Sequence, residues 1–398
     1  MKKNKRMLLL AGDGLSAFGA WIDFLAILTL AAYQYQVSAY QMAVVSAAGL
    51  LPGMLLGPAL GRGCDRGDPQ RLLQASIALR LAITGGILGC ADYGLFLLLV
   101  GLRSVFAAVA PPAINVLAVR SVPVQDRQRF YAQLNVVNSA AKVLAPVVGA
   151  AASSFHGEPL ALGLSLALSA AAWGVFGLLP PALQRVEEQG ATAGASQVGV
   201  AGPVLPLLWI GATQAFMTFC VNNLVPVMLQ QGGIDKGMLG LLVACSGAGN
   251  ILSGLWLARR AAMNRCVGRP GELVAPLLAQ AAGFGLMGAA LAPGAALAVI
   301  VWPPLFFAIG TASARFAVAL NVYLGTHHAS TMGAASGRLQ SWQQAMIFVA
   351  PLVGAWVLER WGATALFGFA AAAGGVSMLL FWLWAGRVRK AAKPACGA

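Results

Sequence analysis

Four charged side chains fall inside long apolar stretches of the sequence: Asp23, Arg103, Lys142 and Arg315. A charged group in hydrocarbon is costly unless it faces a partner or a watery cavity, so such residues often mark paths for ions or polar solutes. Asp23 is the one acid of the four and suits a proton carrier, with Arg103 as its coupling partner. Lys142 and Arg315 suit positive charges offered to an anionic ligand.

A structural role is open for each of these four residues. Asp23 can form a permanent ion pair with Arg103 or Lys142, and a nearby cation would keep its pKa from rising on burial. We favour function for Lys142, because a buried ion pair rarely stabilises a protein more than an apolar pair does. Arg315 can instead extend its guanidinium toward the membrane surface.

Other polar residues have simpler expected roles. Asp13 lies close to the start of its apolar stretch and is expected to be a solvated residue near a helix start. Arg80 is expected to extend toward the surface or to contact another helix. His327 and His328 are adjacent, but a metal site needs further ligands, so a solvated loop is expected there.

Amide side chains and one tryptophan add uncharged binding capacity on the apolar stretches. Polar groups avoid the lipid face, so about half of the amides are expected to reach a cavity while the others join helices. The candidates for contact with a ligand are Asn115, Asn135, Asn138, Asn222, Asn321, Gln340, Trp342 and Gln343.

The composition indicates an integral membrane protein. Of the 398 residues, 59% are hydrophobic and 10% are charged, and the mean hydropathy is +0.76. A soluble domain has about 25% charged residues. Uninterrupted apolar runs favour helices over the two-residue alternation of a membrane barrel. The predicted fold class is therefore an all-α membrane protein.

The apolar runs divide the chain into twelve predicted spans. The first resembles a signal peptide but is too long and lacks a convincing cleavage site, so we expect it to be retained. A polar, glycine-rich linker at 182–203 separates an N-terminal six-helix bundle, 1–181, from a C-terminal one, 204–398. The spans are 8–33, 41–61, 73–91, 94–119, 131–154, 159–181, 204–230, 237–258, 272–291, 295–323, 334–358 and 361–386.

The net charge of +14 is concentrated on alternate connections. Arginine and lysine precede the first span and follow the second, fourth, sixth, eighth and last ones, whereas the intervening connections hold only Lys236 and Arg360. This asymmetry predicts that both termini are cytoplasmic. The membrane that we expect is the inner membrane of a bacterium. No loop is long enough for a nucleic-acid-binding domain, so nucleic acid is not an expected partner.

An internal repeat supports two matching halves. The segment 144–150 (LAPVVGA) returns as 349–355 (VAPLVGA), which aligns Pro146 and Gly149 with Pro351 and Gly354. Proline and small residues permit a bend and close helix packing. Two repeats of six helices around a central site are a plan found in secondary transporters.

The loop after the second span carries a charge pattern suited to a conformational latch at a helix end. It contains Gly61, Asp65, Arg66 and Arg71 in the spacing G-x-x-x-D-R-x-G-x-x-[R/K]. This resembles motif A of the major facilitator superfamily. The resemblance implies two pseudo-symmetric six-helix bundles that expose one site alternately to each side.

Weaker resemblances suggest a branch of that superfamily. Arg103 resembles the arginine of motif B, although Phe106 and Ala107 replace the usual Gln-Gly. The segment 145–150 resembles the core of motif C, which is associated with antiporters, with alanine for its first glycine. The run 111–113 with Asn115, together with Asn321, Tyr323, Gly337 and Arg338, is similar to exporters of enterobactin-type siderophores.

The sequence therefore predicts a monomeric secondary transporter with a small-molecule substrate, protons and the lipid bilayer as partners. The resemblance implies export of a polar or anionic compound, a siderophore above all, by proton antiport. A multidrug efflux pump, a metabolite importer and a membrane scaffold are the alternatives. No phosphate-binding loop or hydrolase motif occurs, so no enzyme activity, cofactor or metal is expected.

Overall fold

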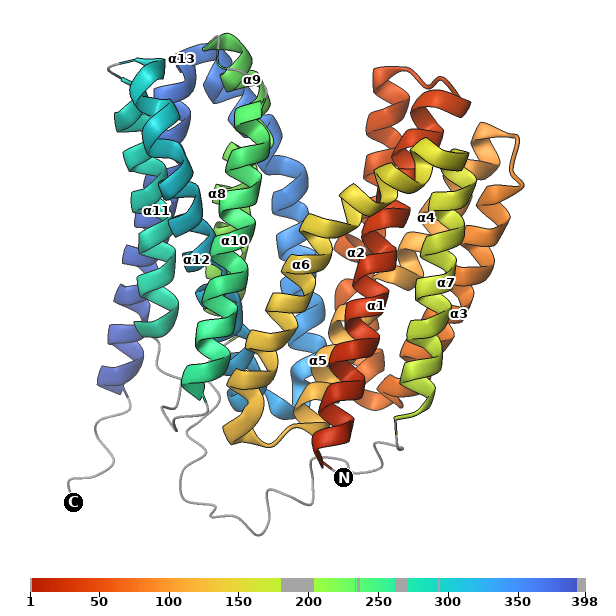
Figure 1. Ribbon diagram of the computed structural model, residues 1–398. Helices are drawn as coiled ribbons and strands as arrows, with labels where there is room; N and C mark the ends of the chain where they lie inside the picture. The colour runs from red at the N-terminus through yellow and green to blue at the C-terminus, as the bar shows by residue number, and fades with distance from the viewer. Residues whose placement is uncertain are drawn as a thin grey trace, which may run out of the picture. The chain divides into compact units, whose positions relative to one another are not determined.

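The computed structural model describes residues 2–179, 204–232, 234, 237–261, 271–292 and 294–391. The predicted linker and the cysteines Cys266 and Cys396 lie outside these ranges. Regular structure in the described part of the chain is entirely helical (Figure 1). The α-helices are α1 Lys2–Thr29, α2 Ala39–Arg66, α3 Pro69–Leu88, α4 Tyr93–Ala107, α5 Ala110–Ser121, α6 Val124–His156, α7 Glu158–Gly177, α8 Leu205–Asn222, α9 Val225–Gln231, α10 Gly237–Ala261, α11 Gly271–Leu291, α12 Ala295–His327 and α13 Met332–Ala391.

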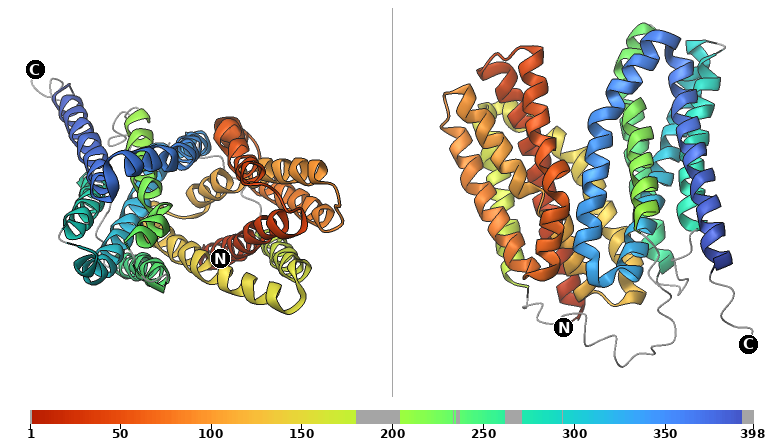
Figure 2. Two further views of the ribbon diagram at one scale, coloured as in Figure 1. Left: turned by 90° about the horizontal axis from the view of Figure 1, so that it is seen from above. Right: turned by 180° about the vertical axis from the view of Figure 1, so that it is seen from behind.

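These helices account for the twelve predicted spans. Ten helical stretches among the described residues are long and apolar enough to cross a membrane. The last of them contains Gly362 at φ 82°, a conformation that favours glycine, and there α13 turns back on itself as two arms (Figure 2). Counting the two arms of α13 separately, and adding the more polar α6, which is not among the ten, gives twelve. Helices α4 and α5 together correspond to the predicted span 94–119, and α8 and α9 together correspond to the predicted span 204–230.

Local sequence explains several helix boundaries. Ser38 and Gln41 form a reciprocal capping box at the start of α2. The Asp68 carboxylate accepts hydrogen bonds from the backbone at the start of α3, where Pro69 occupies the first position. Prolines near the starts of α5 and α9 cannot donate backbone hydrogen bonds, which accounts for the interruptions before them.

The contacts divide the chain into two compact units. Unit 1 comprises Met1–Gly202, Leu255–Cys266 and Asn321–Gln344, and unit 2 comprises Pro203–Gly254, Val267–Leu320 and Ala345–Ala398. Many large apolar side chains are exposed, among them Leu55, Leu98 and Val147, as lipid-facing surfaces require. The predicted boundaries of the two bundles remain predictions.

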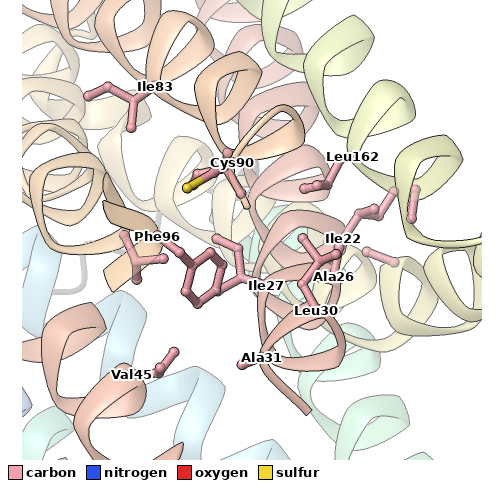
Figure 3. Close-up of a cluster of buried hydrophobic side chains, with 14 residues drawn as sticks. Ile22, Ala26, Ile27, Leu30, Ala31, Val45, Ile83, Cys90, Phe96 and Leu162 are labelled. Carbon is pink, nitrogen blue, oxygen red and sulfur yellow. The ribbon is translucent and has the colours of Figure 1, made fainter. Parts of the chain in front are cut away.

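The core of unit 1 forms around α1. This helix packs against α6 and α7, and α3 packs against α4 and α7 (Figure 1). Figure 3 shows Ile22 and Ile27 of α1 in a buried apolar cluster with Ile83 of α3, Phe96 of α4 and Leu162 of α7. This cluster occupies the turns of α1 around and beyond Asp23, and so gives that carboxylate an apolar neighbour.

The repeated Pro-x-x-Gly segment faces the first helix of the unit in both units. In unit 1, a Cβ built on Gly149 of α6 would lie 3.5 Å from Ile22 of α1, the first helix of that unit. In unit 2, Gly354 of α13 lies against the backbone of Cys220 of α8, where no Cβ fits without displacement. Small residues allow helices to approach closely in membranes, and Gly354 makes such an approach, whereas a methyl group at Gly149 would meet Ile22 at an ordinary contact distance.

Candidate functional site

Asp23 and Arg103 form a buried ion pair in unit 1. The Asp23 side chain on α1 accepts a hydrogen bond through Oδ2 from Nη2 of Arg103 on α4. The two residues are 3% and 8% exposed. The Nε of Arg103 donates to Oγ1 of Thr84 on α3, at 3.3 Å. Three helices thus hold one carboxylate and one guanidinium in a fixed orientation, with the apolar cluster of Figure 3 beside them.

Arg80 belongs to the same cluster. It lies one turn before Thr84 on α3, is 6% exposed, and experiences the charges of both Arg103 and Asp23. The expectation that it extends toward the surface is therefore wrong, whereas the alternative of a contact between helices fits its position. Two cations and one carboxylate leave this buried cluster with an excess of positive charge.

A second polar region lies where α6 faces α1. Nδ2 of Asn138 donates to Oδ2 of Asp13 at 3.0 Å, and Nζ of Lys142 lies 5.8 Å from the centre of the Trp21 ring. Asp13 is half-buried and bound to an amide, which differs from the solvated role expected for it. Lys142 is exposed and forms no ion pair within the described residues. Since α6 carries these groups at helical spacing, with half-buried Asn135 on the same side, it presents one polar face.

A third feature joins the end of α2 to the start of α13 in unit 1. The Asp65 carboxylate accepts hydrogen bonds from the backbone N–H groups of Gly333 and Ala334, at 2.7 and 2.8 Å. Gly61 lies against the backbone at Gly333, and a Cβ there would clash. Arg120 donates to the backbone oxygen of Asp65 at 2.8 Å. A carboxylate at a helix N-terminus is favourable because it faces unpaired N–H groups and the positive end of the dipole.

The two arginines predicted for this latch do not contribute to the junction of α2 with α13. Arg66 is exposed, and exposed Arg71 pairs with Asp68 on its own helix at 3.3 Å. Arg127 of α6 instead bridges to the end of α12. It donates to the carbonyl of Gly325 and to carbonyls of its own neighbouring segment.

The remaining predicted ligand contacts are scattered. Asn115 donates to Oγ of Ser336 at 2.8 Å, so it joins helices in unit 1. Gln340 has a buried Oε1 that accepts no hydrogen bond from the described residues, and Nδ2 of Asn135 likewise finds no acceptor there. Arg315 and Asn222 are exposed, whereas half-buried side chains belong to Asn321, Trp342 and Gln343.

The turn between α12 and α13 differs from the solvated loop expected from sequence. His327 stacks on Tyr323, and His328 is buried. Burial, together with the neighbouring His327, lowers the pKa of His328, so this side chain is neutral near pH 7. Within the described residues, no three His, Cys, Asp or Glu side chains gather closely enough to hold a metal ion.

Sequence reasoning missed Arg80, Thr84, Arg120 and Arg127 as members of these clusters. The spacing of Arg80 and Thr84 places both on one face of α3, which was an available signal. Arg120 and Arg127 belong to the basic residues that were used only to predict membrane orientation. No local pattern distinguishes an arginine that binds backbone carbonyls from one that faces solvent.

The fold and the buried charges define a multi-pass membrane protein of the transporter class. The sequence pattern of the Major Facilitator Superfamily matches residues 9–351, and the chain belongs to that family. A curated relative, the uncharacterized MFS-type transporter YfiS of Bacillus subtilis (strain 168), is 30% identical over 154 residues. That match spans 38% of this chain and 37% of the relative.

Solved structures confirm the fold. The human organic anion transporter MFSD10 (TETRAN) aligns with a TM-score of 0.73 at 15% identity, over 96% of this chain and 99% of that one. The E. coli fucose:proton symporter FucP aligns with a TM-score of 0.71 at 14% identity, over 95% and 98%. A bacterial homologue of the iron transporter ferroportin, in an outward-facing state, gives 0.68 at 15% identity, over 96% and 99%. These structures show that the chain has the predicted all-α fold, and the family to which it belongs is one of membrane transporters.

Proposed function

We propose that this transporter exports a polar or anionic small molecule, with a siderophore as the best candidate, in exchange for protons. It acts as a monomer in a bacterial inner membrane, with both termini in the cytoplasm. The bundles 1–181 and 204–398, joined by the linker 182–203, expose one binding region alternately to each side.

The buried pair of Asp23 and Arg103 carries this proposal. Removing either partner of a buried ion pair leaves an uncompensated charge, so proton uptake by Asp23 and release of Arg103 are linked events in this proposal. Oδ1 of Asp23 has no donor among the described residues, which leaves an acceptor site for the proton. Coupling follows when the protonated state and the substrate-loaded state favour opposite orientations of the transporter.

The polar face of α6 supports a ligand that is polar or anionic. Lys142 is exposed, is not neutralised by an ion pair within the described residues, and lies one turn from Asn138. A lysine over a tryptophan ring keeps its charge available to a ligand while the ring holds its position. This arrangement disfavours lipophilic cations, which a multidrug pump would carry.

The proposal is tested with purified protein in liposomes that contain a pH-sensitive dye. Dihydroxybenzoylserine is the anionic catecholate probe and ethidium the cationic one. A catecholate gradient should drive proton movement in the opposite direction through the wild type but not through Asp23→Asn. Proton movement with ethidium alone would identify a multidrug pump, and movement in the same direction as the catecholate would refute antiport.

Lys142→Gln tests the ligand site separately. We expect a higher concentration of catecholate for half-maximal flux, by about tenfold if one charge-assisted contact of about 1.4 kcal/mol is lost. Arg129→Gln, at an exposed position on the same helix, is the matched control. An unchanged half-maximal concentration in Lys142→Gln would remove the ammonium group from the site.

A further inference from the structure

Two complementary polar atoms remain without hydrogen bonds in the buried cluster around Asp23. The carboxylate uses Oδ2 for Arg103, whereas Oδ1 is buried and finds no donor among the described residues. The Nε of Arg80 is buried and finds no acceptor there. An unpaired buried polar group is destabilising, so both atoms gain if they meet.

The charges of this cluster also favour a contact between Arg80 and Asp23. Arg80 and Arg103 place two guanidinium groups against one carboxylate, and all three side chains are more than nine-tenths buried. Arg80 is attracted by Asp23 and repelled by Arg103. In a region of low polarity such forces act strongly, because little water screens them. Arg80 and Asp23 therefore attract each other even without a direct hydrogen bond.

The other groups that face this part of α1 are identified by their contacts. From α6, Lys142 approaches Trp21, two residues before Asp23. From α7, Oγ of Ser165 donates to the carbonyl of Gly19 at 3.0 Å and contributes no charge. Arg80 is thus the additional cation whose unpaired donor matches the unpaired acceptor of Asp23.

We propose that Arg80 is a second partner for Asp23 and helps to set the pH at which this buried carboxylate takes up its proton. The inference deepens the proposed function and depends on it for its role in transport. In the proposed contact, Nε–H of Arg80 donates to Oδ1 while Arg103 keeps Oδ2. When a proton occupies Oδ1, the two guanidinium groups lose the anion between them. Their repulsion then favours an arrangement in which water reaches Arg80. Arg80 acts through Asp23 and is a positioning residue.

The test measures protonation of Asp23 directly and needs no substrate. Dicyclohexylcarbodiimide modifies buried carboxyl groups only in their protonated form, and mass spectrometry of the α1 peptide gives the modified fraction at each pH. Arg80→Gln should raise the pH of half-maximal modification of Asp23 by about 1 to 3 units, the usual effect of one nearby charge. Arg80→Lys should restore most of the wild-type profile because it keeps the charge. Asp13, on the same peptide and bound to Asn138, is the internal control and should keep its profile.

The outcomes separate this inference from the proposed function. An unchanged profile in Arg80→Gln overturns the inference, as does an Arg80→Lys profile shifted as far as that of Arg80→Gln. The expected shift, combined with undiminished proton exchange in Asp23→Asn liposomes, would leave the role of Arg80 intact and refute Asp23 as the coupling group.

Discussion

The junction of Asp65 with the start of α13 gives the sharpest prediction of a conformational effect. Asp65→Asn keeps the size of the side chain and removes its charge. In the wild type, the Asp65 carboxylate accepts two charge-assisted hydrogen bonds from backbone N–H groups, at 2.7 and 2.8 Å, and each is worth about 1.5–3 kcal/mol. Asparagine keeps one neutral acceptor, and Asp65 is only half-buried, so we expect a net loss of about 2 kcal/mol. That loss is about a 30-fold change in the equilibrium between joined and separated helix ends.

The assay is a distance measurement between two spin labels in unit 1. The labels are attached at Arg62→Cys of α2 and Arg338→Cys of α13, both exposed positions, after the six native cysteines are replaced. The ratio of the short-distance to the long-distance population should fall by about 30-fold from the parent protein to Asp65→Asn. Asp68→Asn is the matched control, since it makes the same chemical change three residues away at the start of α3. Equal short-distance populations in both variants would refute the proposed contribution of the Asp65 contact.

Three further variants test packing and buried polar groups. Gly337→Leu should separate the same helix ends, because a side chain there meets the backbone of Gly57, whereas Gly101→Leu, at an open position, should not. Arg127→Gln should lower the melting temperature in detergent by several degrees through the loss of charged hydrogen bonds to carbonyls; an unchanged value would contradict that role. Gln280→Leu should raise the melting temperature, since neither polar atom of this fully buried side chain has a partner among the described residues. A lower value in that variant would show that Gln280 has a polar partner, such as bound water.

The fold was largely predictable because lipid imposes strong constraints on sequence. Span lengths and apolar runs predicted the helices, and the Pro-x-x-Gly repeat marked equivalent packing positions at Gly149 and Gly354. The sequence was less informative about interruptions within single spans. The break at Gly362, where φ is positive, falls one residue after the predicted start of the last span at 361, but the separate α5 and α9 were not foreseen.

The clusters of charge were less predictable than the helices. The sequence indicates that Asp23 needs a cation, but the choice between Arg103 and Lys142 depends on which face of α4 or α6 meets α1. Arg71 matches the family spacing, yet a neighbouring aspartate three residues away offers a closer partner. Tertiary contacts between distant helices settle such choices, and no spacing within one helix encodes them.

We propose that protonation of Asp23 couples the pH gradient to transport. The most direct measurement compares two modes in the same liposomes, exchange of labelled for unlabelled catecholate without a pH gradient and accumulation of catecholate against its own gradient when a pH gradient is applied. Asp23→Asn should keep the exchange and lose the accumulation, because the binding region remains while the proton site is gone. Accumulation at the wild-type level in Asp23→Asn would contradict the claim.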